Sequence, residues 1–205
     1  MKFKYNLGIA LIPSLEDIDN LYSLVNDIST TFPLSFTTTG LNIPHVTLFA
    51  GKYKTPFPVI DAVEDYTTSK IKKTQDIEGM GIWAEKIIFL NLKKEALRDV
   101  HRYFFQTASP FSKKKPTDSQ NFNGITSGQQ RSLNKTGYPF SLYEYLPHFT
   151  LAHFKEIPEN KKEIESDLNE ILRDHNMKQV KFENLVIFNM SPLGACQEVI
   201  WNKIL

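Results

Sequence analysis

A five-residue pattern, Pro-His-x-Thr-Leu, occurs twice in this chain and carries two side chains that can do chemistry. The copies contain His45 with Thr47 and His148 with Thr150, and the two histidines are 103 positions apart. Each copy lies in a short β-type run, in which side chains alternate between the two faces of a sheet. A His and a Thr two positions apart therefore share a face. Each copy predicts a strand that presents an imidazole and a hydroxyl on one side and apolar residues on the other.

Two imidazoles that face one cleft can divide acid and base work. With an ordinary pKa of ~6.5, one can stay neutral and accept a proton while the other is charged and donates one. In-line displacement at phosphorus needs a base for the attacking hydroxyl or water and an acid for the leaving oxygen, and no metal is then required. Threonine hydroxyls can hold the non-bridging phosphate oxygens. We therefore expect His45 and His148 to be catalytic, Thr47 and Thr150 to bind substrate, and no metal or other cofactor to take part.

The repetition decides between a functional and a structural interpretation. A single His-x-Thr-Leu string would be weak evidence, because alternating strands produce it by accident and a lone strand histidine is usually structural. Two copies, each preceded by proline and one in each half of the chain, are much harder to assign to chance. The pair therefore favours function.

Composition limits the class of protein. The chain has 205 residues, 41% hydrophobic and 23% charged, with a net charge of +1. These values are typical of a globular protein, and the weak net charge argues against one that coats long nucleic acid. Cys196 has no partner for an internal disulfide, and no apolar run is long enough to span a bilayer. We expect a cytoplasmic monomer that is not associated with membranes, and the weak net charge leaves small anions or a single RNA end as ligands.

The remaining chain predicts alternating strands and helices. Periodicity predicts strands over 3–12, within 82–92, and near 180–190 and 199–204, and helices over 14–31, 59–66, 95–107 and 164–175. Residues 109–142 lose this pattern and are expected to form a long loop, a candidate lid over the substrate. The range 1–205 is expected to form a single domain of two lobes, related as a diverged duplication.

Some side chains outside the two motifs have a structural interpretation that we favour over a functional one. The basic residues of the 109–142 segment fit a solvated surface better than a clamp on phosphate. Core packing is favoured over base stacking for most aromatics near the motifs, and packing over catalysis for two helical histidines. These side chains are Lys113, Lys114, Lys115, Arg131 and Lys135; Phe49, Trp83, Tyr138 and Phe154; and His101 and His175.

The paired strings resemble those of the 2H phosphoesterase superfamily, the LigT-like and cyclic phosphodiesterase proteins, whose signature is two His-x-Thr/Ser-x motifs. The resemblance implies an α+β fold of two pseudo-symmetric lobes, each a mainly antiparallel sheet with outer helices, around a central cleft. It also implies activity on 2',3'-cyclic phosphates, 2'-5' linkages and related RNA or nucleotide ends. Many members carry a basic residue after the second motif, where this chain has His153. On a continuous strand, His153 would face away from His148.

The leading hypothesis is a metal-independent phosphodiesterase that hydrolyses 2',3'-cyclic phosphate or 2'-5' phosphodiester bonds in nucleotides or RNA ends. Alternatives within the enzymes are a hydrolase of a cyclic oligonucleotide signal and an RNA 2'-5' end-joining enzyme. A nucleotide- or RNA-binding module without turnover and a purely structural protein remain as alternatives from other classes. The motifs alone do not decide which histidine is the acid.

Overall fold

The computed structural model describes residues 4–40, 42–112, 123–191 and 195–205. Within these ranges the strands are β1 (Tyr5–Pro13), β2 (Leu34–Thr37), β3 (Val46–Tyr53), β4 (Thr74–Trp83), β5 (Ile87–Leu92), β6 (His148–Phe154), β7 (Gln179–Met190) and β8 (Cys196–Ile204). The α-helices are α1 (Leu15–Thr31), α2 (Phe57–Glu64), α3 (Arg98–Ala108), α4 (Ser127–Thr136) and α5 (Lys161–Asp174).

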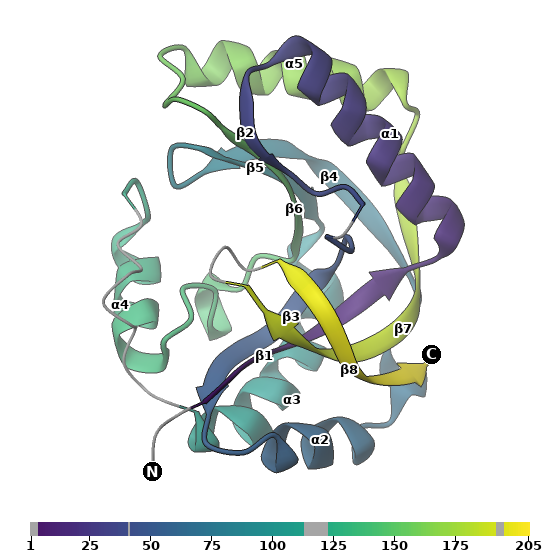
Figure 1. Ribbon diagram of the computed structural model, residues 1–205, viewed down its shortest axis with the longest axis vertical. Coiled ribbons are helices and arrows are strands. Elements are labelled where there is room, and N and C mark those ends of the chain that lie inside the picture. Colours follow the sequence, from purple (N-terminus) through teal and green to yellow (C-terminus); the bar gives the residue numbers. More distant parts are fainter. Residues whose placement is uncertain (1–3, 41, 113–122, 192–194) are drawn as a thin grey trace.

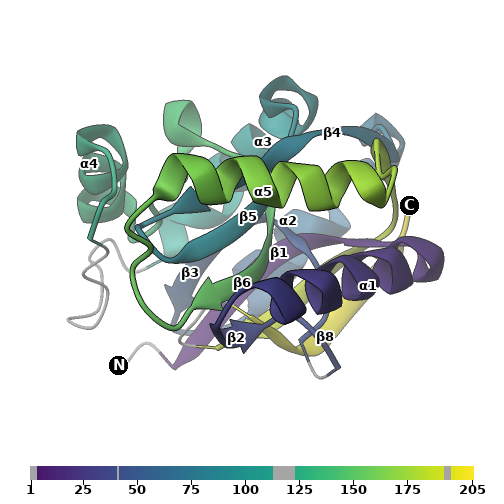
Figure 2. The ribbon, with the colours of Figure 1, turned by 90° about the horizontal axis from the view of Figure 1, so that it is seen from above.

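One antiparallel sheet runs through the molecule in the order β1-β3-β6-β5-β4-β7-β8, with β2 beside β6. Strand β7 also pairs with β1, so six strands close on themselves. The sheet divides into a first lobe of β1, β3, β7 and β8, flanked by α2 and α3, and a second lobe of β2, β4, β5 and β6, flanked by α1 and α5 (Figure 1). Figure 2 shows α1 and α5 lying along the second lobe.

The lobes meet in two places along the sheet. Strand β3 pairs with β6 through Val46 and Phe149, and the start of β4 pairs with the start of β7. Both Val46 and Phe149 are fully buried. The two predicted motif strands therefore lie side by side at the junction of the lobes.

Helix α1 forms where the sequence predicts it, and its first turn is tied to the sheet. The hydroxyl of Ser14 accepts a hydrogen bond from the Asp17 backbone N–H at 3.3 Å, as an N-cap does. The Asp17 carboxylate in turn accepts from the Lys181 backbone N–H of β7 at 2.9 Å. The helix buries Leu21 and Ile28 on its inner face. Capping and burial together hold this helix against the sheet.

The segment 109–142 differs from the loop expected there, because it contains helix α4. Thr126 and Gln129 form a capping box at its start, and Gly137 ends it with a φ of 80°. The helix is polar, so hydrophobic periodicity does not reveal it. Arg131 and Lys135 are exposed on it. Lys113, Lys114 and Lys115 lie outside the described residues, and the role of the segment as a lid stays a prediction.

Two further elements depart from the sequence expectations. Strand β2 was not predicted, and β4 begins at Thr74, well before the predicted strands. The third predicted helix starts with a 3-10 turn over Lys94–Leu97 before α3 begins. The other predicted helices and strands are present. Among the described residues, no helix is long and apolar enough to cross a membrane.

Candidate active site

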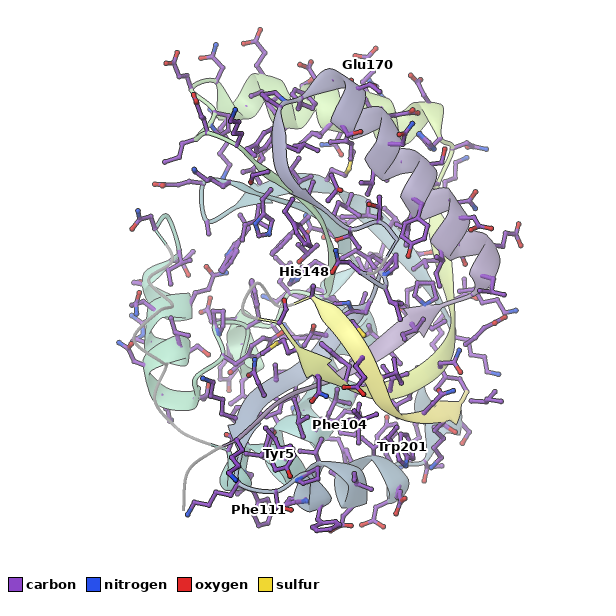
Figure 3. All side chains as sticks on the ribbon, in the orientation of Figure 1. Tyr5, Phe104, Phe111, His148, Glu170 and Trp201 are labelled. Atoms are coloured by element: carbon purple, nitrogen blue, oxygen red, sulfur yellow. The ribbon has the colours of Figure 1, made fainter. Side chains whose placement is uncertain are left out.

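The pairing of Val46 with Phe149 brings the two motifs together. Because side chains alternate along a strand, the neighbours of these two buried residues point to the opposite face of the sheet. His45 and Thr47 therefore share one face with His148 and Thr150; we call it the motif face. In ideal antiparallel geometry His45 lies opposite Thr150, and the two histidines are diagonal neighbours about 7–8 Å apart. Figure 3 places His148 near the centre of the molecule, between the two lobes.

Each catalytic candidate is anchored in the same way. The Nδ1 of His45 lies 2.9 Å from the carbonyl oxygen of Ile43, and the Nδ1 of His148 lies 2.7 Å from that of Leu146. A carbonyl can only accept, so each ring carries its proton on Nδ1 when neutral. This leaves Nε2 of each ring as the proton-accepting atom. One proline lies between each histidine and its carbonyl partner, which stiffens this link.

Both motif strands contain a β-bulge at the leucine that ends the motif. Opposite β1 the pairing skips Leu48, and opposite β5 it skips Leu151. A bulged residue leaves a backbone group without its ladder partner. The carbonyl of Leu151 accepts instead from the Thr38 backbone N–H at 2.7 Å, and that of Leu48 is bonded to His101 Nδ1 at 2.6 Å. The two motif strands thus contain the same bulge, but the bulge carbonyl is hydrogen-bonded to a different partner in each.

The two threonines are available to a ligand. Thr47 and Thr150 are both partly exposed on the motif face. Within the described part of the chain, neither hydroxyl makes a hydrogen bond, while the backbone around them is held. Thr38 Oγ1 donates to the Thr150 carbonyl at 2.6 Å, and the Tyr145 hydroxyl donates to the Thr47 carbonyl at 3.4 Å. Two hydroxyls on a fixed backbone can bind the oxygens of one phosphate.

The surroundings of the two histidines differ, which their sequence motifs do not show. The His148 ring stacks on Phe89 at 3.6 Å and contacts Phe140 at 4.9 Å between ring centroids. His45 has a tilted contact with Phe188 at 4.8 Å. Burial lowers the pKa of His148 to about 4, and the nearby His45 acts in the same direction, against the bond to the Leu146 carbonyl. The surroundings of His148 therefore disfavour its charged form.

A small hollow lies beside His45. Its lining combines aromatic, amide, hydroxyl and apolar groups from both lobes: Phe36, Thr38, Asn42, Ile43, His45, Thr150 and Ala195. Sequence reasoning missed Phe36 and Asn42, because β2 and the turn after it carry no motif. It also missed Asn91, which pairs with His148 across β5 and β6 and whose Oδ1 is buried without a hydrogen-bond partner among the described residues.

The expectation that His153 faces away from His148 is wrong. That expectation assumed a continuous strand, but the bulge at Leu151 shifts the alternation by one residue. Leu151 and Ala152 are consecutive buried residues, and His153 is again partly exposed. His153 therefore lies on the motif face with His148 and Thr150.

His101 is buried, as predicted, and links three parts of the site. Its Nδ1 donates to the Leu48 carbonyl, its Nε2 accepts from the Leu142 backbone N–H at 2.8 Å, and its ring stacks on Tyr145 at 4.0 Å. Burial lowers its pKa to about 4, and Arg102 acts in the same direction, against the bond to Leu48. A protonated ring could not accept from Leu142. His101 is thus a neutral clamp between α3, the first motif strand and the chain that leads to the second motif.

The lowered pKa of His101 predicts that the fold loses stability in acid. An unfolded histidine takes up a proton near pH 6.5, whereas folded His101 takes one up only near pH 4. The stabilisation is therefore complete above pH 6.5 and is lost as the pH falls towards 4, by up to about 3 kcal/mol. We expect His101→Gln, which keeps a donor and an acceptor but does not titrate, to show a smaller fall in the free energy of unfolding. Urea unfolding of both proteins at pH 7, 5.5 and 4 measures this, and equal falls would contradict it.

The described residues show no metal-ligand cluster: no group of three or more His, Cys, Asp or Glu side chains is placed to hold a metal ion. Cys196 is buried, and burial raises the pKa of its thiol to about 12, so it is not a nucleophile at neutral pH. His175 lies at the end of α5, away from the motif face, and its Nε2 is hydrogen-bonded to the Asp27 carboxylate at 2.8 Å.

No protein-family model and no curated protein matches this chain. Solved structures do match it. TT0787 of Thermus thermophilus is 12% identical with a TM-score of 0.55, over 98% of this chain and 97% of TT0787. A structure described as a phosphoesterase is 11% identical with a TM-score of 0.49, over 98% of this chain and 99% of its own. Usb1 of Kluyveromyces marxianus is 10% identical with a TM-score of 0.44, over 98% of this chain and 97% of Usb1.

The likeness to TT0787 extends over nearly the full length of both chains. At 12% identity, a likeness of this extent is one of fold. The fold implied by the paired motifs, an α+β fold of the LigT-like 2H phosphoesterase type with antiparallel strands and outer helices, is confirmed, but the strands form one sheet where two were expected.

Proposed function

We propose that this protein is a metal-independent phosphodiesterase that hydrolyses 2',3'-cyclic phosphate or 2'-5' phosphodiester bonds in nucleotides or RNA ends. The observation that carries the proposal is the pairing of Val46 with Phe149, which puts two equally anchored imidazoles and two hydroxyls on one face. That set matches the needs of displacement at phosphorus: a base, an acid and donors for the non-bridging oxygens.

The reaction on a cyclic phosphate needs two proton transfers. A neutral imidazole takes a proton from water as the water oxygen forms a bond to phosphorus. A protonated imidazole gives a proton to the ribose oxygen whose bond to phosphorus breaks. The hydroxyls of Thr47 and Thr150 donate to the non-bridging oxygens as negative charge builds up on them. On a 2'-5' linkage, the neighbouring 3'-hydroxyl can attack in place of water.

His148 is the base in this proposal and His45 the acid. A base must be neutral before the reaction, and the buried, aromatic surroundings of His148 disfavour its charged form. His45 is the other member of the pair, and it lines the small hollow together with Thr150. The different surroundings of the two rings support this assignment, which the near-identical motifs leave open.

This assignment predicts an unusual pH profile. A base with a pKa of about 4 is neutral throughout the range above pH 5. The acid limb of kcat/KM, which reports the essential base of the free enzyme, should therefore fall near pH 4 and not near 6.5. Initial rates from pH 3.5 to 8 on one substrate measure it, with circular dichroism to confirm that the protein stays folded. A limb near pH 6.5 would give the base role to another group.

The first test of the proposal is an assay in EDTA on a defined set of substrates. Wild-type protein and His148→Ala are incubated with 2',3'-cyclic nucleotides, 2'-5' oligoadenylates and cyclic dinucleotides, and products are resolved by mass. We expect turnover by wild type alone and in the presence of EDTA. Product masses also distinguish hydrolysis of an end, cleavage of a cyclic oligonucleotide and end joining. Tight binding of unchanged nucleotide without turnover would instead support a binding module.

A further inference from the structure

A row of partly exposed side chains crosses the motif face of the second lobe. Strand register pairs Phe36 of β2 with His153 of β6, His153 with Ile87 of β5, and Ile87 with Trp83 of β4. Paired residues in a sheet point to the same face, so the four side chains lie in line over four neighbouring strands. At about 4.8 Å per strand, the row spans about 14 Å. All four are partly exposed.

The bulge in β6 is what puts this row on the motif face. Without it, His153 would point to the helices, whereas Ile87 shares the face of Phe89 through the alternation of β5 itself. With the bulge, the pair of His153 and Ile87 comes next to the pair of Thr150 and Phe89 on the same face of the sheet. Phe36 also lines the hollow that contains His45 and Thr150. The row is therefore continuous with the proposed catalytic centre.

The chemistry of the row suits a flat, uncharged group. None of the four side chains is an acid, a lysine or an arginine. The His153 ring packs on Phe36 at 4.9 Å between centroids, and burial lowers the pKa of His153, so its imidazole is neutral at pH 7. Its Nε2 is buried without a hydrogen-bond partner among the described residues. Such a surface offers ring faces to a base and no charge to a phosphate.

The opposite end of the row is closed. Trp83 stacks on Phe89 at 5.5 Å and contacts Phe140 at 4.9 Å, and its Nε1 donates to Gln129 of α4 at 3.1 Å. Phe89 and Phe140 are both almost fully buried around His148. The end formed by Phe36 and His153, next to the hollow, is therefore where a ring has room.

We propose that Phe36, His153 and Ile87 form a nucleobase subsite, so that the base of the substrate stacks on the second lobe while its phosphate binds between the two motifs. This inference rests on the proposed phosphodiesterase function and adds to it that the substrate carries a base next to the reacting phosphate. The hollow lined by Phe36, His45 and Thr150 lies between the subsite and the first motif.

The test compares a substrate that has a base with one that has none. Wild type, Phe36→Ala and His153→Ala are assayed on adenosine 2',3'-cyclic phosphate and on ribose 2,3-cyclic phosphate. Removing an aromatic platform costs ~1–3 kcal/mol per stacked base, which is about 5–150-fold. We expect Phe36→Ala to lower kcat/KM by that factor on the nucleotide, mainly through KM, and to leave the base-free substrate unchanged. His153→Ala should show the same selectivity.

Two matched variants guard against an effect on folding. Phe57→Ala removes a phenylalanine that is 67% exposed on α2 and should leave both substrates unchanged. Phe36→Trp keeps a platform and should retain activity on the nucleotide. Equal losses on both substrates in Phe36→Ala, or no loss on either, would overturn the subsite.

A binding measurement separates failure of the subsite from failure of the proposed function. Titration with adenosine 3'-monophosphate and with ribose 3-phosphate reports on the base without any turnover. If wild type binds the nucleotide more tightly and Phe36→Ala removes that preference, the subsite holds even when no substrate is cleaved. If wild type binds both alike, the subsite is wrong, whatever its activity.

Discussion

Replacing either motif histidine with alanine should lower kcat/KM by about 10²–10⁴, the range that a positioned acid or base contributes. The reason is geometric: Nε2 of each ring is the one atom of its motif that can exchange a proton with substrate, because Nδ1 is bonded to a carbonyl. The double variant His45→Ala with His148→Ala should be little slower than the worse single variant, since acid and base act in one transition state. Steady-state kinetics on the best substrate of the panel measures all three.

The control for this experiment is His175→Ala, because His175 pairs with Asp27 at the end of α5 and lies away from the motif face. It should keep wild-type turnover. His148→Gln should be tested beside His148→Ala, since the alanine leaves a gap against Phe89, and the unfolding midpoints show whether either variant has lost its fold. Near-normal rates in folded His45→Ala or His148→Ala would rule out the two-histidine mechanism.

Removing either motif hydroxyl should be the next largest effect. Thr47→Val and Thr150→Val keep the shape of the side chain but not its donor, and loss of one donor to developing negative charge costs about 10²–10³ in kcat. We expect little change in KM, because these bonds strengthen as charge moves to the non-bridging oxygens. The measurement is kcat and KM for both variants on the same substrate.

Serine variants distinguish the hydroxyl from the rest of the side chain. Thr47→Ser and Thr150→Ser keep the donor and should recover most of the lost kcat. Thr30→Val, on the exposed side of α1, is the matched control and should behave as wild type. If valine and serine variants lose activity equally, the threonines act by packing and not by binding phosphate oxygens.

Much of the local structure can be predicted from the sequence. The strand that ends at Pro13, the cap at Ser14 and the buried stripe of α1 agree with the patterns that predict them. The shared face of His and Thr within each motif follows from the two-residue period of a strand. The Thr126–Gln129 capping box indicates the start of helix α4. Because this helix is polar, no hydrophobic periodicity supports that indication.

The relation between the motifs is a property of the tertiary structure. Val46 and Phe149 pair because both lobes bury their strands against one another, and no local pattern encodes a partner that distant. The same holds for the closed ring of strands and for the aromatic rings from separate segments that make the surroundings of His148 unlike those of His45.

By itself the sequence determined the candidate site residues: two histidines and two threonines, repeated at one spacing, with each pair on one face of its strand. Only the tertiary structure decided how these residues meet, that aromatic rings surround His148, and that His153 lies on the motif face. For His153 the physical reason is a β-bulge at Leu151, whose carbonyl accepts a hydrogen bond from the Thr38 backbone, because the bulge reverses the alternation on which the sequence argument depended. Periodicity is local, but a bulge depends on the strands packed on either side of it.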